Sequence, residues 1–322
     1  MGEKVKTYKI AHRPHVLLRP TGGDSKIVLN ASVGVGRAQL PGSTFCVLGL
    51  AGNRRSDTLP MIRPIVKWFG GKYYLAPKII ALFPPHQVYV EPFGGAASVL
   101  LNKPPSPVEV YNDLDGRIVR LFRVLRDQPQ EFQRRLALTP YAEMEWQQAV
   151  CQPPPEDEIE AARRDFVRWR MSLAGRGESF SYSLQRTRRG MADVVSGFLS
   201  AIDEVLPQIV ERFRRVQILC RDALEVIDRW DSPKTLFYCD PPYHPQTVRY
   251  PQSYLHSYSE QDHERLLDRL CRCRAKVVLS GYACPLYEQK LSHWRCFRFS
   301  IANHASTRRK KQYQQEMVWC NW

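Results

Sequence analysis

The stretch Leu236-Phe237-Tyr238-Cys239-Asp240-Pro241-Pro242-Tyr243 decides the fold class, because it joins an apolar run to a stiff polar loop. Residues 236–239 predict a buried strand, and the two prolines that follow restrict the backbone where this strand ends. In open α/β folds, ligands bind just beyond the carboxyl ends of the strands. The stretch therefore indicates an α/β sheet with a functional loop at residues 240–243.

The composition of this loop suits chemistry on an exocyclic aromatic amine, whose lone pair is delocalised into the ring. Two acceptors that hold the two amine hydrogens favour a more tetrahedral nitrogen with an available lone pair. The Asp240 carboxylate and the Pro241 carbonyl can be these acceptors, and the Tyr243 ring can stack on a base extruded from a duplex. By itself, Asp-Pro-Pro-Tyr is also compatible with a proline-rich turn after a strand.

Two further loops precede this one in the chain. Glu91-Pro92-Phe93-Gly94-Gly95 ends an apolar strand at residues 88–91, and its glycines let the backbone approach a ligand closely. About 20 residues further on, Asp113 follows a second strand, where an acidic side chain can hold ribose hydroxyls. The other loop, Lys67-Trp68-Phe69-Gly70-Gly71-Lys72, suits a flat or anionic group, although alone it is equally compatible with a surface turn.

From residue 61 onwards, strand and helix patterns alternate, which predicts βαβ units and a parallel sheet. Residues 116–214 break this rhythm with helical patterns at residues 130–138, 142–150, 157–173 and 198–213. Near their centre, the sequence QRTRRG at 185–190 predicts a basic hairpin tip with a positive φ at its glycine. We therefore expect a catalytic domain formed by residues 61–115 and 215–322, interrupted by a helical insertion at 116–214.

Residues 1–60 differ from the rest of the chain. They hold eight of the 18 glycines and show no helical period, and Met61 opens a segment that resembles the start of a protein. We expect a poorly ordered N-terminal extension here, with a small structured module as the alternative.

The composition favours a polyanionic partner, because Lys and Arg number 47 against 32 Asp and Glu, a formal net charge of +15. The nine cysteines contain no CxxC pair, which indicates reduced thiols and no metal site. The sequence contains no run of 18 apolar residues, so it predicts no membrane-spanning helix. The N-terminal residues show no signal peptide pattern. We expect a cytoplasmic protein.

Together, the three loops, Asn112-Asp113 and the basic insertion resemble, in this order, the DNA adenine methyltransferase (Dam) family over residues 62–322. The resemblance implies a Rossmann-like sheet that binds S-adenosylmethionine, and methyl transfer to N6 of an adenine flipped out of double-stranded DNA. It implies a catalytic loop of Asp240, Pro241, Pro242 and Tyr243. The cofactor-binding residues that it implies are Trp68, Phe69, Gly70, Lys72, Glu91, Pro92, Phe93, Gly94, Asp113, Asp222 and Asp240.

Within this set, residues 68–72 would meet the methionine end of the cofactor, Asp113 its ribose and Asp222 its adenine. The insertion would read the DNA, and we expect Arg186, Arg188 and Arg189 to contact it. These arginines do not match the GATC-reading segment of the family, and phage and prophage members with other targets are more similar. The target sequence therefore stays open.

Three other functions compete with this interpretation. A similar proline loop serves N4-cytosine and protein-glutamine methyltransferases, although an initial Asp and a preceding cofactor loop favour adenine. A catalytically inactive DNA-binding protein on the same fold is the third. We further expect a monomer, paired in a restriction–modification system with a cognate restriction enzyme.

Overall fold

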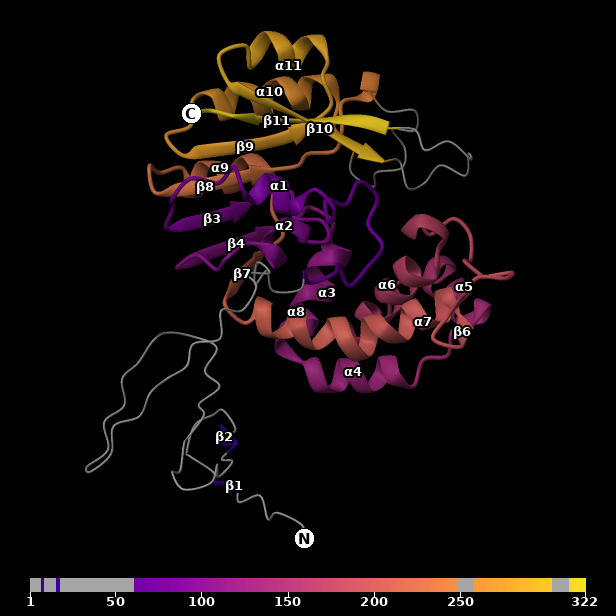
Figure 1. Cartoon of the computed structure of the whole chain (residues 1–322). Coiled ribbons are helices and arrows are strands. Elements are labelled where there is room, and N and C mark those ends of the chain that lie inside the picture. Colours follow the sequence, from indigo (N-terminus) through magenta and orange to yellow (C-terminus); the bar gives the residue numbers. More distant parts are fainter. Residues whose placement is uncertain (1–6, 9–15, 18–60, 248–256, 303–312) are drawn as a thin grey trace, which may run out of the picture. The chain divides into compact units, whose positions relative to one another are not determined.

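The structure, a computed structural model, describes residues 7–8, 16–17, 61–247, 257–302 and 313–322 (Figure 1). The chain divides into two units, residues 1–59 and 60–322. In the first unit, β1 (Thr7–Tyr8) pairs with β2 (Val16–Leu17) in antiparallel fashion. The other residues of the expected extension at 1–60 lie outside the described residues, so its poor order stays a prediction.

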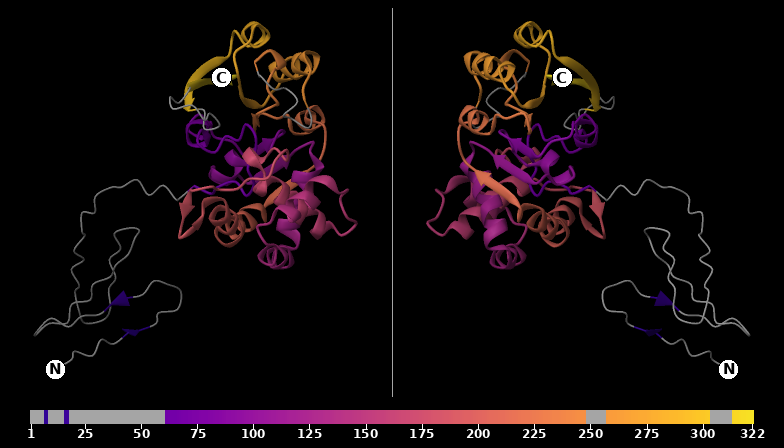
Figure 2. Two further views of the ribbon diagram at one scale, coloured as in Figure 1. Left: turned by 90° about the vertical axis from the view of Figure 1, so that its right-hand side faces the viewer. Right: turned by 90° about the vertical axis from the view of Figure 1, so that its left-hand side faces the viewer.

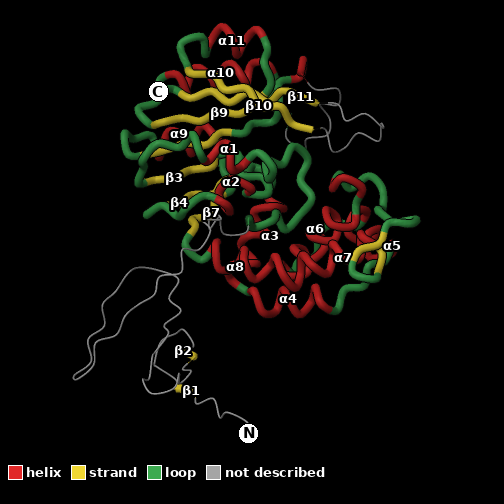
Figure 3. The backbone as a smooth tube through the Cα atoms, in the orientation of Figure 1, coloured by secondary structure: helices red, strands yellow, loops and turns green. Residues whose placement is uncertain are grey.

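The second unit is built on one seven-stranded sheet (Figures 1 and 3). Its spatial order is β10 (Arg295–Ala302), β11 (Tyr313–Cys320), β9 (Lys276–Gly281), β8 (Thr235–Cys239), β3 (Val88–Glu91), β4 (Val108–Asn112) and β7 (Val216–Leu219). The five strands from β9 to β7 are parallel, whereas β11 runs antiparallel between β9 and β10. This arrangement confirms the expected Rossmann-like α/β sheet.

Side chains alternate between the two faces of the sheet and so build two cores. On one face, Tyr89 and Tyr111 pack with helices α1 (Ala76–Ile80), α2 (Ser98–Asn102), α3 (Gly116–Asp127) and α8 (Leu206–Phe213). On the other face, Val90 and Val110 pack with α9 (Ala223–Trp230), α10 (Glu260–Cys271) and α11 (Pro285–Lys290). Helices therefore cover both sides of the sheet, as Figure 2 shows.

Helix α3 illustrates how the sequence forms these layers. The Asp115 side chain accepts a hydrogen bond from the Arg117 backbone N–H at 3.0 Å and so caps the helix. Ile118, Phe122 and Leu125, spaced about one turn apart, are fully buried. The Phe122 ring stacks on Phe213 of α8, with ring centroids 4.3 Å apart. The first and last helices of the expected insertion thus share the core of the sheet.

The remaining helices of the expected insertion are α4 (Pro129–Ala137), α5 (Glu143–Cys151), α6 (Glu158–Met171) and α7 (Asp193–Ser200). A π-helical segment, Ala201–Val205, joins α7 to α8. The first three agree with the predicted helical patterns. Helix α7 begins earlier than predicted. Its first turns contain two valines and Gly197, which are weak helix formers, so the local sequence does not indicate a helix there. Burial of Phe198 in the core stabilises the helix instead. The boundaries of the insertion at 116 and 214 stay a prediction.

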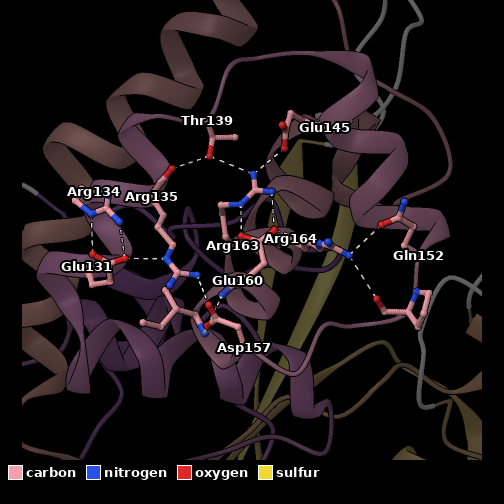
Figure 4. A network of polar contacts seen from close by, with 12 residues as sticks. Glu131, Arg134, Arg135, Thr139, Glu145, Gln152, Asp157, Glu160, Arg163 and Arg164 are labelled. Carbon is pink, nitrogen blue, oxygen red and sulfur yellow. Dashed lines mark hydrogen bonds and ion pairs between the residues drawn. The ribbon is translucent and has the colours of Figure 1, made fainter.

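A network of ion pairs joins helices α4, α5 and α6 (Figure 4). Arg163 of α6 donates to Glu145 of α5 at 2.7 Å and to Glu160 of its own helix at 2.8 Å. Arg135 of α4 donates at 2.5 Å to Asp157, which caps α6. Arg163 pairs with carboxylates of both α5 and α6. Such a network fixes the relative positions of the helices more firmly than isolated ion pairs on the surface would.

A second ionic cluster is buried between the sheet and α8. Glu109 of β4 is 1% exposed and accepts hydrogen bonds from Lys103 at 2.6 Å and from Arg212 at 2.7 Å. Burial raises the pKa of Glu109, but these hydrogen bonds outweigh it and lower the pKa to about 2. Arg212 also donates to the Leu100 carbonyl, so one guanidinium ties α8 to β4 and α2.

We expect Glu109→Ala to lower the free energy of unfolding by about 3–5 kcal/mol, because it leaves two buried cations unpaired. The contribution of the carboxylate should be complete above pH 4.5, its ordinary pKa, and should be lost as the pH falls towards 2. Urea denaturation at several pH values measures both effects. Glu211→Ala, which removes an exposed carboxylate, is the matched control, and equal stability of the two variants would contradict the prediction.

Candidate active site

The loops that follow β3, β4 and β8 meet at one edge of the sheet, because parallel strands all end there. They line a cavity of about 300 Å³, a size suited to a small ligand. The predicted site residues in its wall are Trp68, Phe69, Gly70, Lys72, Glu91, Pro92, Phe93, Gly94, Asp113, Asp240, Pro241, Pro242 and Tyr243. The structure therefore brings together three sequence motifs, and Lys72 and Tyr243 in two of them are 171 residues apart in the chain.

Lys72 is the centre of the polar contacts in this cavity. Its ammonium lies 2.9 Å from Asp240 Oδ1, donates to the Tyr243 hydroxyl at 2.6 Å and donates to the Gly70 carbonyl at 3.0 Å. Burial lowers the pKa of Lys72, but the carboxylates of Asp240 and Glu316 outweigh it and raise the pKa well above 10.5. Lys72 thus carries a positive charge at neutral pH and directs it at the Asp-Pro-Pro-Tyr loop.

Ser280 of β9 also holds the Asp240 carboxylate. Its hydroxyl donates to Asp240 Oδ1 at 2.8 Å and lies 3.1 Å from the Tyr238 hydroxyl. In the described part of the chain, both contacts to Asp240 use Oδ1, and Oδ2 accepts no hydrogen bond. One carboxylate oxygen is therefore held and the other is available to a substrate.

Glu91, at the end of β3, is a buried carboxyl group. It is 2% exposed and accepts a hydrogen bond from the Tyr89 hydroxyl at 2.6 Å. Burial raises the pKa of Glu91 to about 8, so the group holds a proton at neutral pH. A neutral Glu91 can donate a hydrogen bond into the cavity as well as accept one.

The glycine turn after β3 is fixed by close contacts. A side chain at Gly94 would place its Cβ 2.2 Å from the Tyr111 ring, and Gly95 has a φ of +45°. The Gly95 N–H donates to Asp113 Oδ2 at 2.7 Å, and the Asp115 N–H donates to Asp113 Oδ1 at 2.8 Å. Asp113 thus holds the turn in place from the neighbouring strand.

Asp222 does not line the cavity. It is exposed and caps α9 by accepting a hydrogen bond from the Leu224 N–H at 2.8 Å, while its neighbours Arg221 and Ala223 reach the cavity wall. Its expected role towards a cofactor adenine stays a prediction.

The predicted basic hairpin is present, formed by β5 (Thr187–Arg188) and β6 (Met191–Ala192). Arg189 and Gly190 have φ angles of 55° and 77°, as the two central residues of a type I′ turn require. Arg186, Arg188 and Arg189 are exposed, and Arg189 forms an ion pair with Glu204. Two of the three arginines therefore project without a carboxylate partner among the described residues.

Several residues of the site were not predicted from the sequence. Trp169 of α6 packs on Trp68 with ring centroids 5.5 Å apart, Arg176 lies over the Phe69 ring, and Tyr258 lies edge-on to Phe93. Glu316 of β11 contacts the Tyr243 hydroxyl. Trp169, Tyr258 and Glu316 come from segments without a glycine or proline motif, so only the fold brings them to the cavity. Arg176 lies between Gly175 and Gly177, a glycine pair that the sequence-based prediction did not use.

The family model for D12 class N6 adenine-specific DNA methyltransferases matches residues 68–150 and 200–308, more than half of the chain. The chain belongs to this family. The methyltransferase thus acts on adenine, which disfavours the cytosine and glutamine alternatives, and it is an enzyme rather than an inactive binding protein.

Curated relatives agree with the family. The methyltransferase is 26% identical to the DNA adenine methylase of Salmonella typhi over 263 residues, which cover 77% of this chain and 92% of the relative. The DNA adenine methylase of Escherichia coli (strain K12) is 25% identical over 260 residues, with the same shares covered. Modification methylase StsI of Streptococcus sanguinis is 35% identical over 77 residues, 24% of this chain and 12% of the relative. The expected similarity to phage and prophage members stays a prediction.

The described residues of the methyltransferase contain no group of three or more His, Cys, Asp or Glu side chains placed to hold a metal ion. Within the same residues, no helix is both long and apolar enough to cross a membrane.

We expect Gly94→Ala to weaken binding of the methyl donor strongly, because the new Cβ would collide with the fully buried Tyr111 and displace the turn. Gly116→Ala is the matched control, since the nearest atom to its added Cβ is 4.0 Å away. Isothermal titration calorimetry with S-adenosylmethionine compares the two variants. Equal affinities would show that the glycine turn does not contact the ligand.

Proposed function

We propose that this methyltransferase moves a methyl group from S-adenosylmethionine to N6 of an adenine flipped out of double-stranded DNA, with residues 240–243 as the catalytic loop. The observation that carries the proposal is the Asp240 carboxylate, which is held through Oδ1 by Lys72 and Ser280 while its Oδ2 accepts no hydrogen bond from the described residues. The net charge of +15 supports DNA as the substrate.

The cavity suits S-adenosylmethionine by size and by chemistry. Phe93 and Tyr258 offer aromatic faces to a purine, whereas Asp113 and a protonated Glu91 offer hydrogen bonds to hydroxyl and amino acid groups. We assign Trp68, Phe69, Gly70 and Lys72 to the methionine end and Glu91, Pro92, Phe93 and Gly94 to the turn beside the cofactor. The bound cofactor supplies an electrophilic methyl group.

Asp240 and Pro241 prepare the target nitrogen. Asp240 Oδ2 and the Pro241 carbonyl accept the two N6 hydrogens, which draws the lone pair out of conjugation with the ring. Attack of the nitrogen on the methyl carbon would break the carbon–sulfur bond of S-adenosylmethionine, whose sulfur would keep the electron pair and leave as the neutral thioether S-adenosylhomocysteine. The surplus N6 proton would pass to solvent. Since Lys72 and Ser280 hold the carboxylate rigidly, this geometry exists before the adenine arrives, which lowers the cost of reorganisation.

Tyr243 and the hairpin complete the proposed DNA site. The Tyr243 ring, half-buried and 4.4 Å from the Tyr282 ring, offers an aromatic surface to the flipped base. Arg186 and Arg188 project from the hairpin, and Arg189 joins them when it exchanges Glu204 for a phosphate or a base. Asp222 remains our candidate for the cofactor adenine.

Other parts of the proposal concern organisation and context. We propose that residues 61–115 and 215–322 form the catalytic domain, that 116–214 recognises the target and that 1–60 are an extension. We further propose that the enzyme is a cytoplasmic monomer. The match to a modification methylase supports a cognate restriction enzyme as a partner.

Expression of the wild-type enzyme should introduce N6-methyladenine into plasmid DNA at one sequence motif, detected by sequencing of modified bases. Asp240→Ala should abolish the modification, because it removes the acceptor for the target amine, yet should bind S-adenosylmethionine nearly as well as wild type. Full activity of Asp240→Ala would refute the proposed chemistry. A variant that loses cofactor binding alone would place Asp240 in the cofactor site instead.

The hairpin arginines can be tested one at a time on the motif so identified. Replacing a phosphate-contacting arginine by alanine should weaken binding to all sequences and lower the salt slope by about one unit. Replacing a base-reading arginine should cost ~1–3 kcal/mol at one base pair and relax the motif there. We expect at least one of Arg186, Arg188 and Arg189 to read a base. A triple alanine variant with unchanged motif, rate and salt dependence would exclude the hairpin from recognition.

A further inference from the structure

Glu316 is a buried carboxylate beside the catalytic loop that no sequence motif indicates. It lies on β11, the strand that runs antiparallel to β9, with Met317 opposite Gly281. Because β11 runs in the reverse direction, its early residues lie at the carboxyl ends of the parallel strands, where the cavity opens. The side chain is 2% exposed. A carboxylate this deeply buried requires partners.

The partners of Glu316 belong to the proposed catalytic machinery. The Tyr243 hydroxyl donates to Glu316 Oε1 at 2.6 Å, and the Lys72 ammonium lies 3.5 Å from the same oxygen. The Tyr243 hydroxyl in turn accepts from Lys72. Glu316, Tyr243, Lys72 and Asp240 therefore form a continuous chain of polar contacts.

Every N–H and O–H donor of Lys72 and Tyr243 in this series of polar contacts has an acceptor. The three N–H groups of Lys72 have three acceptors, namely Gly70 O, the Tyr243 hydroxyl and Asp240 Oδ1. The Tyr243 hydroxyl has one proton, and Glu316 is its acceptor. Without this carboxylate, the tyrosine proton would lack its partner and Lys72 would be attracted by Asp240 alone. The ammonium could then reach both oxygens of Asp240 and compete with the target amine.

We propose that Glu316 is a positioning residue for methyl transfer, which anchors the Tyr243 hydroxyl and shares the charge of Lys72, so that one oxygen of Asp240 stays free for the adenine. The inference rests on the proposed roles of Asp240 and Tyr243. Glu316 touches neither substrate nor cofactor in this scheme, and it acts through Tyr243 and Lys72. Lys72, which we also assign to the methionine end of the cofactor, keeps its contacts with Asp240 and Gly70 when Glu316 is changed. The main effect is therefore expected on the rate of transfer.

The charge of Glu316 makes this role distinguishable from simple packing. A negative charge next to Lys72 raises the pKa of the ammonium, together with Asp240. Glu316→Gln keeps the size and one oxygen acceptor but removes the charge, and should therefore lower the pKa of Lys72. The high-pH limb of the rate profile should then move to lower pH, because a deprotonated Lys72 no longer donates to Asp240 and Tyr243 together.

The test uses the full-length enzyme and a duplex that carries the motif found by sequencing. Single-turnover transfer of tritiated methyl groups should be roughly ten- to a hundredfold slower in Glu316→Gln, as expected for the loss of a charged hydrogen-bond partner. The affinity for S-adenosylmethionine, measured by calorimetry, should change by less than about twofold, since Lys72 keeps its contacts with Asp240 and Gly70. Gln315→Ala, at the exposed neighbouring position of the same strand, is the matched control and should equal wild type in both measurements.

Tyr243→Phe provides a second variant that keeps the ring and removes only the hydroxyl. If Glu316 acts through this hydroxyl, Tyr243→Phe should also slow the transfer, and the double variant should be little slower than either single one. Additive effects of the two substitutions would overturn the proposed coupling, as would a Glu316→Gln variant with wild-type rate and pH profile. Thermal melting identifies any variant that loses activity because it unfolds. The Gln and Phe substitutions keep nearly the same side-chain volume, so both variants are expected to fold.

The outcomes separate this inference from the proposed function. A fully active Asp240→Ala variant would refute the proposed chemistry itself. An inactive Asp240→Ala variant beside a fully active Glu316→Gln variant would refute only the role of Glu316.

Discussion

The buried contact between Lys72 and Asp240 is the interaction on which the rest of the active site depends. Two opposite charges inside a protein are costly to desolvate, and their attraction compensates only where further hydrogen bonds complete the arrangement. Here the Ser280 and Tyr243 hydroxyls and the Gly70 carbonyl complete it. Because each partner comes from a different part of the chain, the ion pair fixes the first glycine loop, the Asp-Pro-Pro-Tyr loop and β9 relative to one another.

The fold supports this contact through shared cores rather than through separate domains. Phe122 of α3 stacks on Phe213 of α8, and both rings pack against Tyr111 of β4. The same Tyr111 limits the space at Gly94, and its hydroxyl donates to the Gly95 carbonyl at 2.7 Å. One tyrosine thus links the helical region, the sheet and the wall of the cavity, so that a movement of the helices would displace the glycine turn after β3.

The sequence was sufficient to predict the parallel sheet, the loops at its edge and the basic hairpin, because these depend on local signals. Apolar runs mark the strands, and Gly95, Pro241 and Gly190 mark backbone conformations that other residues adopt less readily. Glu316, Tyr258 and Trp169 could not be predicted, since their roles depend on which strand or helix lies beside the cavity. The start of α7 was misjudged because burial of Phe198 outweighs weak local propensity. Asp222 caps a helix outside the cavity wall, and its expected role towards a cofactor adenine stays a prediction.

The position of β11 between β9 and β10 also has a consequence for how the protein folds. Lys72 and Tyr243 are 171 residues apart, and Tyr243 and Glu316 are 73 residues apart, so these contacts close long loops that carry a large entropic cost. The local helices and the basic hairpin can form earlier. The contacts among Lys72, Tyr243 and Glu316 can therefore assemble only after β11 has joined the sheet beside β9, so the capacity to act on a base is acquired later than the local structure of the chain.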